Sequence, residues 1–192
     1  MLGIECSGSI IFMPAKISRQ LKNRLRRIRL LLCDVDGVLT DGTVFIGGPD
    51  EFKAFNIQDG FGLVLLRRAG LAVGWVSARP STATARRARE LKIDFLVQQK
   101  DRDSKVAAVE KILAQAGRKW DEVCFVGDDI VDLGPLRRAG VAVAVANAVA
   151  EAKAAAHVVT RAAGGHGAVR EVVEMILKAQ GQWKNFVAHY TE

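Results

Sequence analysis

Two aspartates separated by one residue, Asp34 and Asp36, follow the apolar run Leu30–Cys33. Such a run is typical of a short buried strand, and the glycines at 37 and 42 indicate a tight turn where it ends. Two carboxylates this close repel each other unless a cation lies between them, and hard oxygen ligands favour Mg²⁺. Alternation along an extended chain lets both acids serve one site from a common side. A solvated acidic turn is the alternative for this pair taken alone.

Three further sites place a reactive or charged side chain at the end or the start of an expected strand or helix. Ser77 follows an apolar run, Lys105 starts an expected helix, and Asp128 and Asp129 follow a run that ends in Gly127. A metal and a lysine neutralise phosphate oxygens, a hydroxyl orients them, and a carboxylate attacks in line. Each position alone has a structural alternative: a turn serine, a solvated lysine and a helix-capping loop. Together, and in this order, they predict phosphoryl transfer.

Apolar runs alternate with helical patterns along most of the chain. This alternation predicts an α/β fold with a mainly parallel sheet and helices on both faces, with the chemistry at the carboxyl ends of the strands. Residues 43–46 and 52–55 flank a Gly-Gly-Pro-Asp turn and predict a β-hairpin. The remaining expected strands are 30–33, 71–76, 94–97, 123–126, 141–145 and 157–160. The expected helices are 59–68 with Asp59 as N-cap, 80–90 opened by Pro80, 105–115 capped by Asp103 or Ser104, a short one ending at 138, 148–156 and 168–179.

The 192 residues have an ordinary globular composition, 49% apolar and 26% charged, which favours one domain. No apolar stretch reaches the length needed to span a bilayer, and the N-terminal segment lacks the features of a signal peptide. Three cysteines are too few for a disulfide framework, so we expect a reduced, cytoplasmic protein.

The formal net charge of +7 is concentrated near the N-terminus, with seven basic residues and no acidic one between Lys16 and Arg29. A nucleic-acid or anionic-membrane arm is one interpretation. A solvated basic helix leading into the first strand is favoured, because no aromatic residues interleave with the charges. We therefore expect a basic N-terminal arm over residues 1–28, a domain over 29–182 and a tail over 183–192.

In order and spacing, these positions resemble the four motifs of the haloacid dehalogenase superfamily of phosphatases. The matching residues are DVDGV from Asp34, then Ser77, Lys105, and GDDxxD from Gly127 to Asp132. Longer stretches resemble a narrower group, the 3-deoxy-D-manno-octulosonate 8-phosphate (KDO 8-phosphate) phosphatases. They are DVDGVLTDG, KAFNIQDGFG over residues 53–62, VGDDIVDL, and TRAAGGHGAVREV over 160–172. The resemblance covers about residues 30–182 and implies a three-layer Rossmann-like domain with a small β-hairpin in place of a cap domain.

The resemblance implies a Mg²⁺-dependent phosphatase for an acidic sugar phosphate, most directly KDO 8-phosphate in lipopolysaccharide sugar biosynthesis. Asp34 would be the nucleophile that forms an aspartyl-phosphate. Asp36 would protonate the departing sugar oxygen and then activate the hydrolytic water. The Mg²⁺ ligands would be Asp34, the backbone carbonyl of Asp36, and Asp128. Ser77 and Lys105 would bind the transferring phosphoryl group.

The remaining implied positions support this site or bind the substrate. Asp129 would hold Lys105 or a metal-bound water, and Asp132 would support the site from the following helix. Arg79 is the candidate for the substrate carboxylate, because a guanidinium can bind it with two hydrogen bonds; a surface arginine is the alternative. The other substrate-binding candidates are Gly42 and Asn56.

The group commonly forms homotetramers whose subunits help close one another's sites. The hairpin and the Gly-Gly-His-Gly loop at 164–167 would take part in that closure. This chain departs from the group's usual pattern at Gln58, at His166 and in the charged segment 98–104. These departures leave the sugar open, so a phosphatase for a nonulosonate 9-phosphate (KDN or sialic acid) is an alternative. A non-enzymatic phospho-receiver or partner subunit is another, which the Asp-x-Asp-Gly after the first strand disfavours.

Overall fold

The computed structural model describes residues 18–47, 50–99 and 105–191. Their main feature is a six-stranded parallel sheet in the order β5-β4-β1-β6-β7-β8. The predicted α/β class with a mainly parallel sheet is confirmed. The strands are β1 (Leu30–Cys33), β4 (Ala72–Ser77), β5 (Phe95–Gln98), β6 (Val123–Gly127), β7 (Val141–Ala144) and β8 (Val158–Val159).

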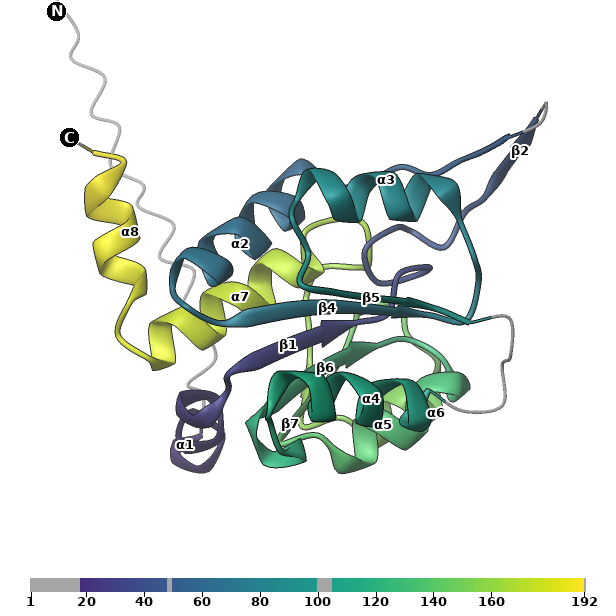
Figure 1. Ribbon diagram of the computed structural model, residues 1–192. Coiled ribbons are helices and arrows are strands. Elements are labelled where there is room, and N and C mark those ends of the chain that lie inside the picture. The colour runs from purple at the N-terminus through teal and green to yellow at the C-terminus, as the bar shows by residue number, and fades with distance from the viewer. Residues whose placement is uncertain (1–17, 48–49, 100–104, 192) are drawn as a thin grey trace, which may run out of the picture.

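Helices cover both faces of this sheet, with α2, α3 and α7 on one side and α4, α5 and α6 on the other (Figure 1). Because β1 lies between two strands and between two helical layers, all four of its residues are buried. An uninterrupted apolar run is what such a position requires. The helices are α2 (Ile57–Arg68), α3 (Thr82–Glu90), α4 (Val106–Ala116), α5 (Leu133–Arg138), α6 (Ala150–Ala155) and α7 (Ala168–Ala179).

The strand register brings the predicted chemical positions to one edge. Cys33 of β1 pairs with Trp75 of β4 and with Val126 of β6. The next residue, Asp34, donates its backbone N–H to Val126 O at 2.9 Å. Parallel strands end on the same side of a sheet, so the residues that follow β1, β4 and β6 meet there.

The predicted N-cap of α2, Asp59, is wrong. Asn56 caps this helix, because its side-chain oxygen accepts the N–H groups of Gln58 at 2.8 Å and Asp59 at 3.1 Å. Asp59 is buried one turn further on and accepts the N–H groups of Gly167 at 3.2 Å and Arg170 at 2.6 Å. Its carboxylate therefore satisfies the free N–H groups at the start of α7, a partner that lies more than a hundred residues away along the chain.

Two other predicted helix starts also shift. The helix α3 does not open at Pro80: its cap is Ser81, whose hydroxyl accepts the N–H of Thr84 at 3.2 Å. At α4, Lys105 occupies the N-cap position without a capping side-chain hydrogen bond. The expected caps Asp103 and Ser104 lie outside the described residues.

The predicted β-hairpin is present as β2 (Phe45–Gly47) and β3 (Asp50–Phe52). It projects away from the sheet near the carboxyl ends of the strands (Figure 1). Phe45, Ile46 and Phe52 are 57%, 87% and 65% exposed. The hairpin thus carries apolar side chains outward while its chain returns toward the site.

Two helices lie at the opposite end of the molecule, α1 (Arg19–Arg27) and α8 (Trp183–His189) (Figure 1). The predicted basic helix before β1 is present as α1, and it buries Leu25 against the domain. Arg24 and Arg26 donate hydrogen bonds to Gly140 O and Ala179 O. The division of the chain at residues 28 and 182 stays a prediction. No described helix has both the length and the apolar character required for a membrane span.

Candidate active site

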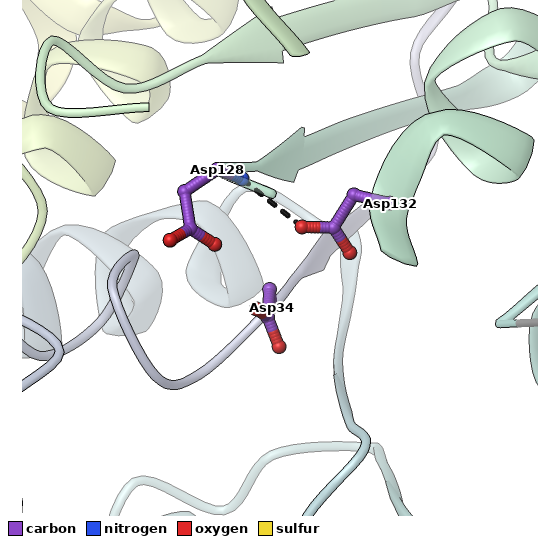
Figure 2. A group of neighbouring side chains, drawn as sticks. All are labelled: Asp34, Asp128 and Asp132. Atoms are coloured by element: carbon purple, nitrogen blue, oxygen red, sulfur yellow. Dashed lines mark hydrogen bonds between the residues drawn. The ribbon is translucent and has the colours of Figure 1, made fainter. Parts of the chain in front are cut away.

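Three carboxylates converge where β1 and β6 end: Asp34, Asp128 and Asp132 (Figure 2). Each contributes an oxygen that lies within 4.8 Å of the others. Asp34 follows β1, Asp128 follows β6, and Asp132 ends the short 3₁₀ helix Ile130–Asp132. Asp34 is 6% exposed and Asp132 is fully buried. With Lys105, these residues are called the inner cluster below.

Asp132 positions its neighbours with both carboxylate oxygens. Its Oδ2 accepts the N–H groups of Asp128 at 3.0 Å and Asp129 at 3.4 Å. Its Oδ1 accepts from Lys105 Nζ at 2.7 Å. The lysine partner expected at Asp129 is thus Asp132, because Asp129 turns its side chain to the N–H of Ile130 at 2.7 Å and caps the 3₁₀ turn.

Lys105 is a buried ammonium held between two carboxylates. Its Nζ lies 2.6 Å from Asp34 Oδ1 and 2.7 Å from Asp132 Oδ1. Burial alone would lower the pKa of Lys105, but the charges of Asp34 and Asp132 outweigh this and raise it. A fixed positive charge therefore stands beside Asp34 at neutral pH.

The inner cluster holds more negative charge than Lys105 neutralises. Burial, opposed by Lys105 and reinforced by Asp132, raises the pKa of Asp34 to about 6. Burial and the charges of Asp34 and Asp132 raise the pKa of Asp128 to about 8. Asp128 Oδ1 is buried without a hydrogen-bond partner. A carboxylate pair with an unsatisfied buried oxygen fits a hard divalent cation such as Mg²⁺.

Gly37 leaves the space that this carboxylate occupies. Its φ is +94°, and a Cβ at this position would lie 2.1 Å from Asp128 Oδ2. A side chain there would displace Asp128 from the inner cluster. The glycine after the Asp-x-Asp pair is therefore required by both its backbone conformation and its close neighbour.

A second set of charges, the outer cluster, consists of Asp36, Lys53, Glu51 and Arg79. Lys53 Nζ lies 2.6 Å from Asp36 Oδ1 and 3.8 Å from Glu51 Oε1. Glu51 also pairs with Arg79. Sequence reasoning missed Lys53 and Glu51; the available signal was an acid and a base two residues apart, on one face of an extended segment.

Arg79 and Ser77 form the turn that follows β4. The Ser77 hydroxyl donates to Arg79 O at 3.0 Å and accepts from Arg79 N at 3.1 Å. Arg79 binds Glu51 through Nη2, whereas its Nη1 is buried without a hydrogen-bond partner. That nitrogen is available to an anionic group of a ligand.

The two clusters meet around a cavity of about 210 Å³. Seven predicted site residues line it: Asp34, Asp36, Ser77, Arg79, Lys105, Asp128 and Asp129. Asn56 lies elsewhere, in a neighbouring cavity of about 420 Å³ with Asp41 and His166. Gly42 has a φ of +86° and donates its N–H to Thr40 Oγ1 at 3.2 Å. The structure thus unites the catalytic candidates and Arg79, but it does not place Asn56 and Gly42 in the lining of the smaller cavity.

The loop that precedes α7 packs against the turn after β1. A Cβ on Gly164 would lie 1.8 Å from Gly37 O, and Gly165 N donates to Val38 O at 3.0 Å. Asn147 connects the two segments, since it donates to Gly37 O at 3.3 Å and accepts from Gly164 N at 2.7 Å. These glycines contact the chain's own catalytic loop, in addition to the role expected for them between subunits.

Comparison with known proteins gives consistent matches. Residues 95–172 match the model of the haloacid dehalogenase-like hydrolases. The 3-deoxy-D-manno-octulosonate 8-phosphate phosphatase of Yersinia pestis is 40% identical over 158 residues, which cover 82% of this chain and 83% of that protein. The counterpart from Escherichia coli K12 is 36% identical over 179 residues, covering 93% and 94%.

Solved structures of similar proteins share the fold. A probable YrbI family phosphatase from Pseudomonas syringae pv. phaseolica 1448a superimposes with a TM-score of 0.87 at 40% identity, covering 91% of this chain and 99% of that one. The 3-deoxy-D-manno-octulosonate 8-phosphate phosphatase of Moraxella catarrhalis, in complex with magnesium, phosphate and KDO, gives 0.84 at 36% identity, covering 88% and 97%.

Proposed function

Because the chain belongs to the KDO 8-phosphate phosphatase family of the haloacid dehalogenase superfamily, we propose that it hydrolyses KDO 8-phosphate to KDO and phosphate. It is a phosphoric monoester hydrolase. The observation that carries the proposal is the buried Asp34, paired with Lys105 and facing the unsatisfied Asp128 at the end of a central strand. The complex of the Moraxella relative with magnesium, phosphate and KDO supports the substrate and the metal.

In this proposal Asp34 attacks the phosphoryl group and becomes an aspartyl-phosphate. Bound Mg²⁺ would supply charge neutralisation at the phosphoryl oxygens. It would be held by the carboxylates of Asp34 and Asp128 and the backbone carbonyl of Asp36. Lys105 holds Asp34 in place and adds positive charge beside it. Ser77, which lines the same cavity, would orient a phosphoryl oxygen.

Asp36 would transfer protons in both halves of the reaction. It gives a proton to the sugar oxygen while the bond from that oxygen to phosphorus breaks. It then takes a proton from the water that attacks the aspartyl-phosphate. Its position at the cavity, one residue beyond Val35, supports this role.

Arg79 would bind the carboxylate of the sugar acid. Its Nη1 is buried without a partner and its side chain lines the catalytic cavity. A guanidinium nitrogen in this state gains a charge-assisted hydrogen bond when a carboxylate arrives.

A phosphate-release screen tests this function. The substrates are KDO 8-phosphate, nonulosonate 9-phosphates, neutral hexose phosphates and p-nitrophenyl phosphate, each with Mg²⁺ and with EDTA. We expect KDO 8-phosphate to have a kcat/KM at least about tenfold above the others, and EDTA to abolish release. A preference for a nonulosonate 9-phosphate would show that this compound, and not KDO 8-phosphate, is the substrate. Stable phosphorylation without turnover would support a phospho-receiver instead.

We also propose that the enzyme assembles as a homotetramer through its hairpin. Phe45, Ile46 and Phe52 are large apolar side chains exposed on one projecting element, as is usual for an association surface. Light scattering is expected to give a tetramer mass for the wild-type chain and a smaller mass for Ile46→Lys. Thr43→Lys, an exposed position just before the hairpin, is the control and should keep the wild-type mass.

The cytoplasm, and a place in lipopolysaccharide sugar biosynthesis, belong to the same proposal. Cys33 and Cys124 are free and buried in neighbouring strands, and burial raises the pKa of both thiols. Such thiols act as small apolar side chains, which agrees with a reducing compartment.

A further inference from the structure

Lys53, in the segment that leaves the hairpin, has a completely buried side chain. The exposed fraction of its side chain is 0%. Its ammonium contacts Asp36 Oδ1 at 2.6 Å, Thr84 Oγ1 at 3.4 Å and Glu51 Oε1 at 3.8 Å. A buried ammonium destabilises a protein unless it is paired, and chains rarely retain one without a use.

The contact with Asp36 is asymmetric. Asp36 Oδ1 is buried and accepts no aligned hydrogen bond, so its contact with Lys53 Nζ is an ion pair. The side chain as a whole keeps 25% of its surface exposed, and this exposed surface belongs to its other atoms. Since Asp36 lines the catalytic cavity, Lys53 occupies one carboxylate oxygen and leaves the second available there.

Lys53 reaches Asp36 from an element unrelated to the inner cluster. Its neighbours Glu51 and Thr84 belong to β3 and α3, whereas Lys105 is the N-cap of α4 and Asp132 ends the 3₁₀ turn after β6. The two lysines therefore serve different carboxylates of the Asp-x-Asp pair: Lys105 contacts Asp34 and Lys53 contacts Asp36.

We propose that Lys53 is a positioning residue for proton transfer, which fixes Asp36 through Oδ1 so that Oδ2 faces the hydrolytic water. This inference rests on the proposed function. In the step concerned, the water oxygen forms a bond to phosphorus and the bond from phosphorus to Asp34 breaks. The electron pair of that bond returns to the Asp34 carboxylate, and a water proton passes to Asp36 Oδ2. Lys53 itself exchanges no proton.

Single-turnover kinetics with p-nitrophenyl phosphate separate this role from general support of the site. Nitrophenolate leaves without being protonated, so its appearance reports the attack by Asp34 alone. Phosphate release reports the hydrolysis of the aspartyl-phosphate, which needs Asp36. For Lys53→Met we expect nitrophenolate to appear within about twofold of the wild-type rate, while phosphate release slows at least about tenfold because a general base is misplaced.

The control is Lys178→Met, which removes an ion pair of the same length, 2.6 Å to Glu174, on α7. Both of its rates should match the wild type. If circular dichroism shows that Lys53→Met does not fold, the same two rates are measured on Lys53→Gln, which keeps a polar group at this site.

Equal slowing of nitrophenolate formation and phosphate release, or no slowing of either, would overturn the positioning role. The proposed function fails in a different way. It fails if the wild-type chain releases no phosphate from p-nitrophenyl phosphate or KDO 8-phosphate. The two failures are therefore distinguishable in the same experiment.

Discussion

The inner and outer clusters differ in how their negative charges are compensated. In the inner cluster, Asp34, Asp128 and Asp132 share one ammonium, so an excess of negative charge remains for a cation. In the outer cluster, two acids alternate with two bases from Asp36 through Lys53 and Glu51 to Arg79. The inner cluster therefore has the excess negative charge that a metal ion requires, whereas the acids and bases of the outer cluster are equal in number.

The two clusters also differ in what carries them. Strand ends and the turns that follow them position the inner cluster, within the body of the domain. The hairpin and the segment leaving it supply half of the outer cluster, Glu51 and Lys53. In the proposed mechanism, phosphoryl transfer would depend on residues held by the central sheet and the turns beside it. Asp36 and Arg79, proposed for proton transfer and sugar recognition, also follow strands of the sheet, but their ion-pair partners Lys53 and Glu51 come from the hairpin and the segment leaving it.

The largest effect is expected at the centre of the inner cluster. Asp34→Asn removes the proposed nucleophile while it keeps the size of the side chain. We expect phosphate release from every substrate to fall by at least about 10⁴-fold, as is usual when a nucleophile is lost. Glu110→Gln, the same change at an exposed position of α4, is the matched control. Turnover near the wild-type rate in Asp34→Asn would remove the nucleophile assignment.

Asp132→Ala tests whether the inner cluster is structural as well as chemical. The substitution leaves Lys105 with one carboxylate and deprives the N–H groups of Asp128 and Asp129 of their acceptor. Loss of one partner from a buried ion pair lowers the free energy of unfolding by about 3 kcal/mol. Urea denaturation monitored by circular dichroism measures this. A change below about 1 kcal/mol, the usual value of a surface pair, would contradict the structural role.

Arg79→Ala tests the substrate side of the outer cluster. We expect kcat/KM for KDO 8-phosphate to fall about 30-fold, the loss of one charge-assisted hydrogen bond of about 2 kcal/mol. The value for p-nitrophenyl phosphate, which has no carboxylate, should change by less than about threefold. Arg86→Ala on the neighbouring helix α3 serves as the control. Equal losses on both substrates would exclude Arg79 from sugar recognition.

The smallest expected effect is the pH dependence of the stability that Mg²⁺ adds to the folded protein. Metal-free, the folded chain holds protons on Asp34 and Asp128 up to about pH 6 and about pH 8. Because these pKa values lie above those of the unfolded chain, the two carboxylates contribute less stability as the pH rises toward them. Mg²⁺ binds the deprotonated forms and removes this penalty.

The difference in Tm between Mg²⁺-saturated and EDTA-treated protein should therefore grow by a few degrees from about pH 5.5 to about pH 8. Thermal unfolding at matched ionic strength measures it. A constant difference across this range would show that the inner cluster does not hold the metal through titrating carboxylates.

The proximity of Asp34 and Asp128 could be expected from the sequence because each directly follows a short apolar strand. The limits of β1 and α7 agree with the expected ones, since both are defined by local apolar patterns. What the sequence could not give was the choice among neighbouring acids. Asp129 caps a 3₁₀ turn and Asp132 ends it, and only the conformation of this turn decides which of the two side chains reaches Lys105.

The outer cluster was only half predicted, because its contacts join segments that are distant in sequence. Glu51 lies in the hairpin and Lys53 directly after it. The local pattern there predicts strands, but it does not show which residues the two charged side chains contact. Asp59 failed as a cap for the same reason: its partners, at the start of α7, lie more than a hundred residues further along the chain. Helix α8 was assigned to a tail, since its short sequence has no strong apolar periodicity.

Because Gly164 lies so close to Gly37, the catalytic loop should tolerate fewer substitutions than the hairpin. A Cβ on Gly164 would collide with the backbone of Gly37, and a Cβ on Gly37 would collide with the carboxylate of Asp128. Neighbours on both sides of the catalytic loop, Gly164 and Asp128, therefore leave no space for a larger side chain there. In the hairpin, by contrast, Phe45, Ile46 and Phe52 are exposed. A new substrate preference would therefore be expected to arise at such exposed hairpin positions and around Arg79, where substitutions can accumulate while the phosphoryl chemistry is unchanged.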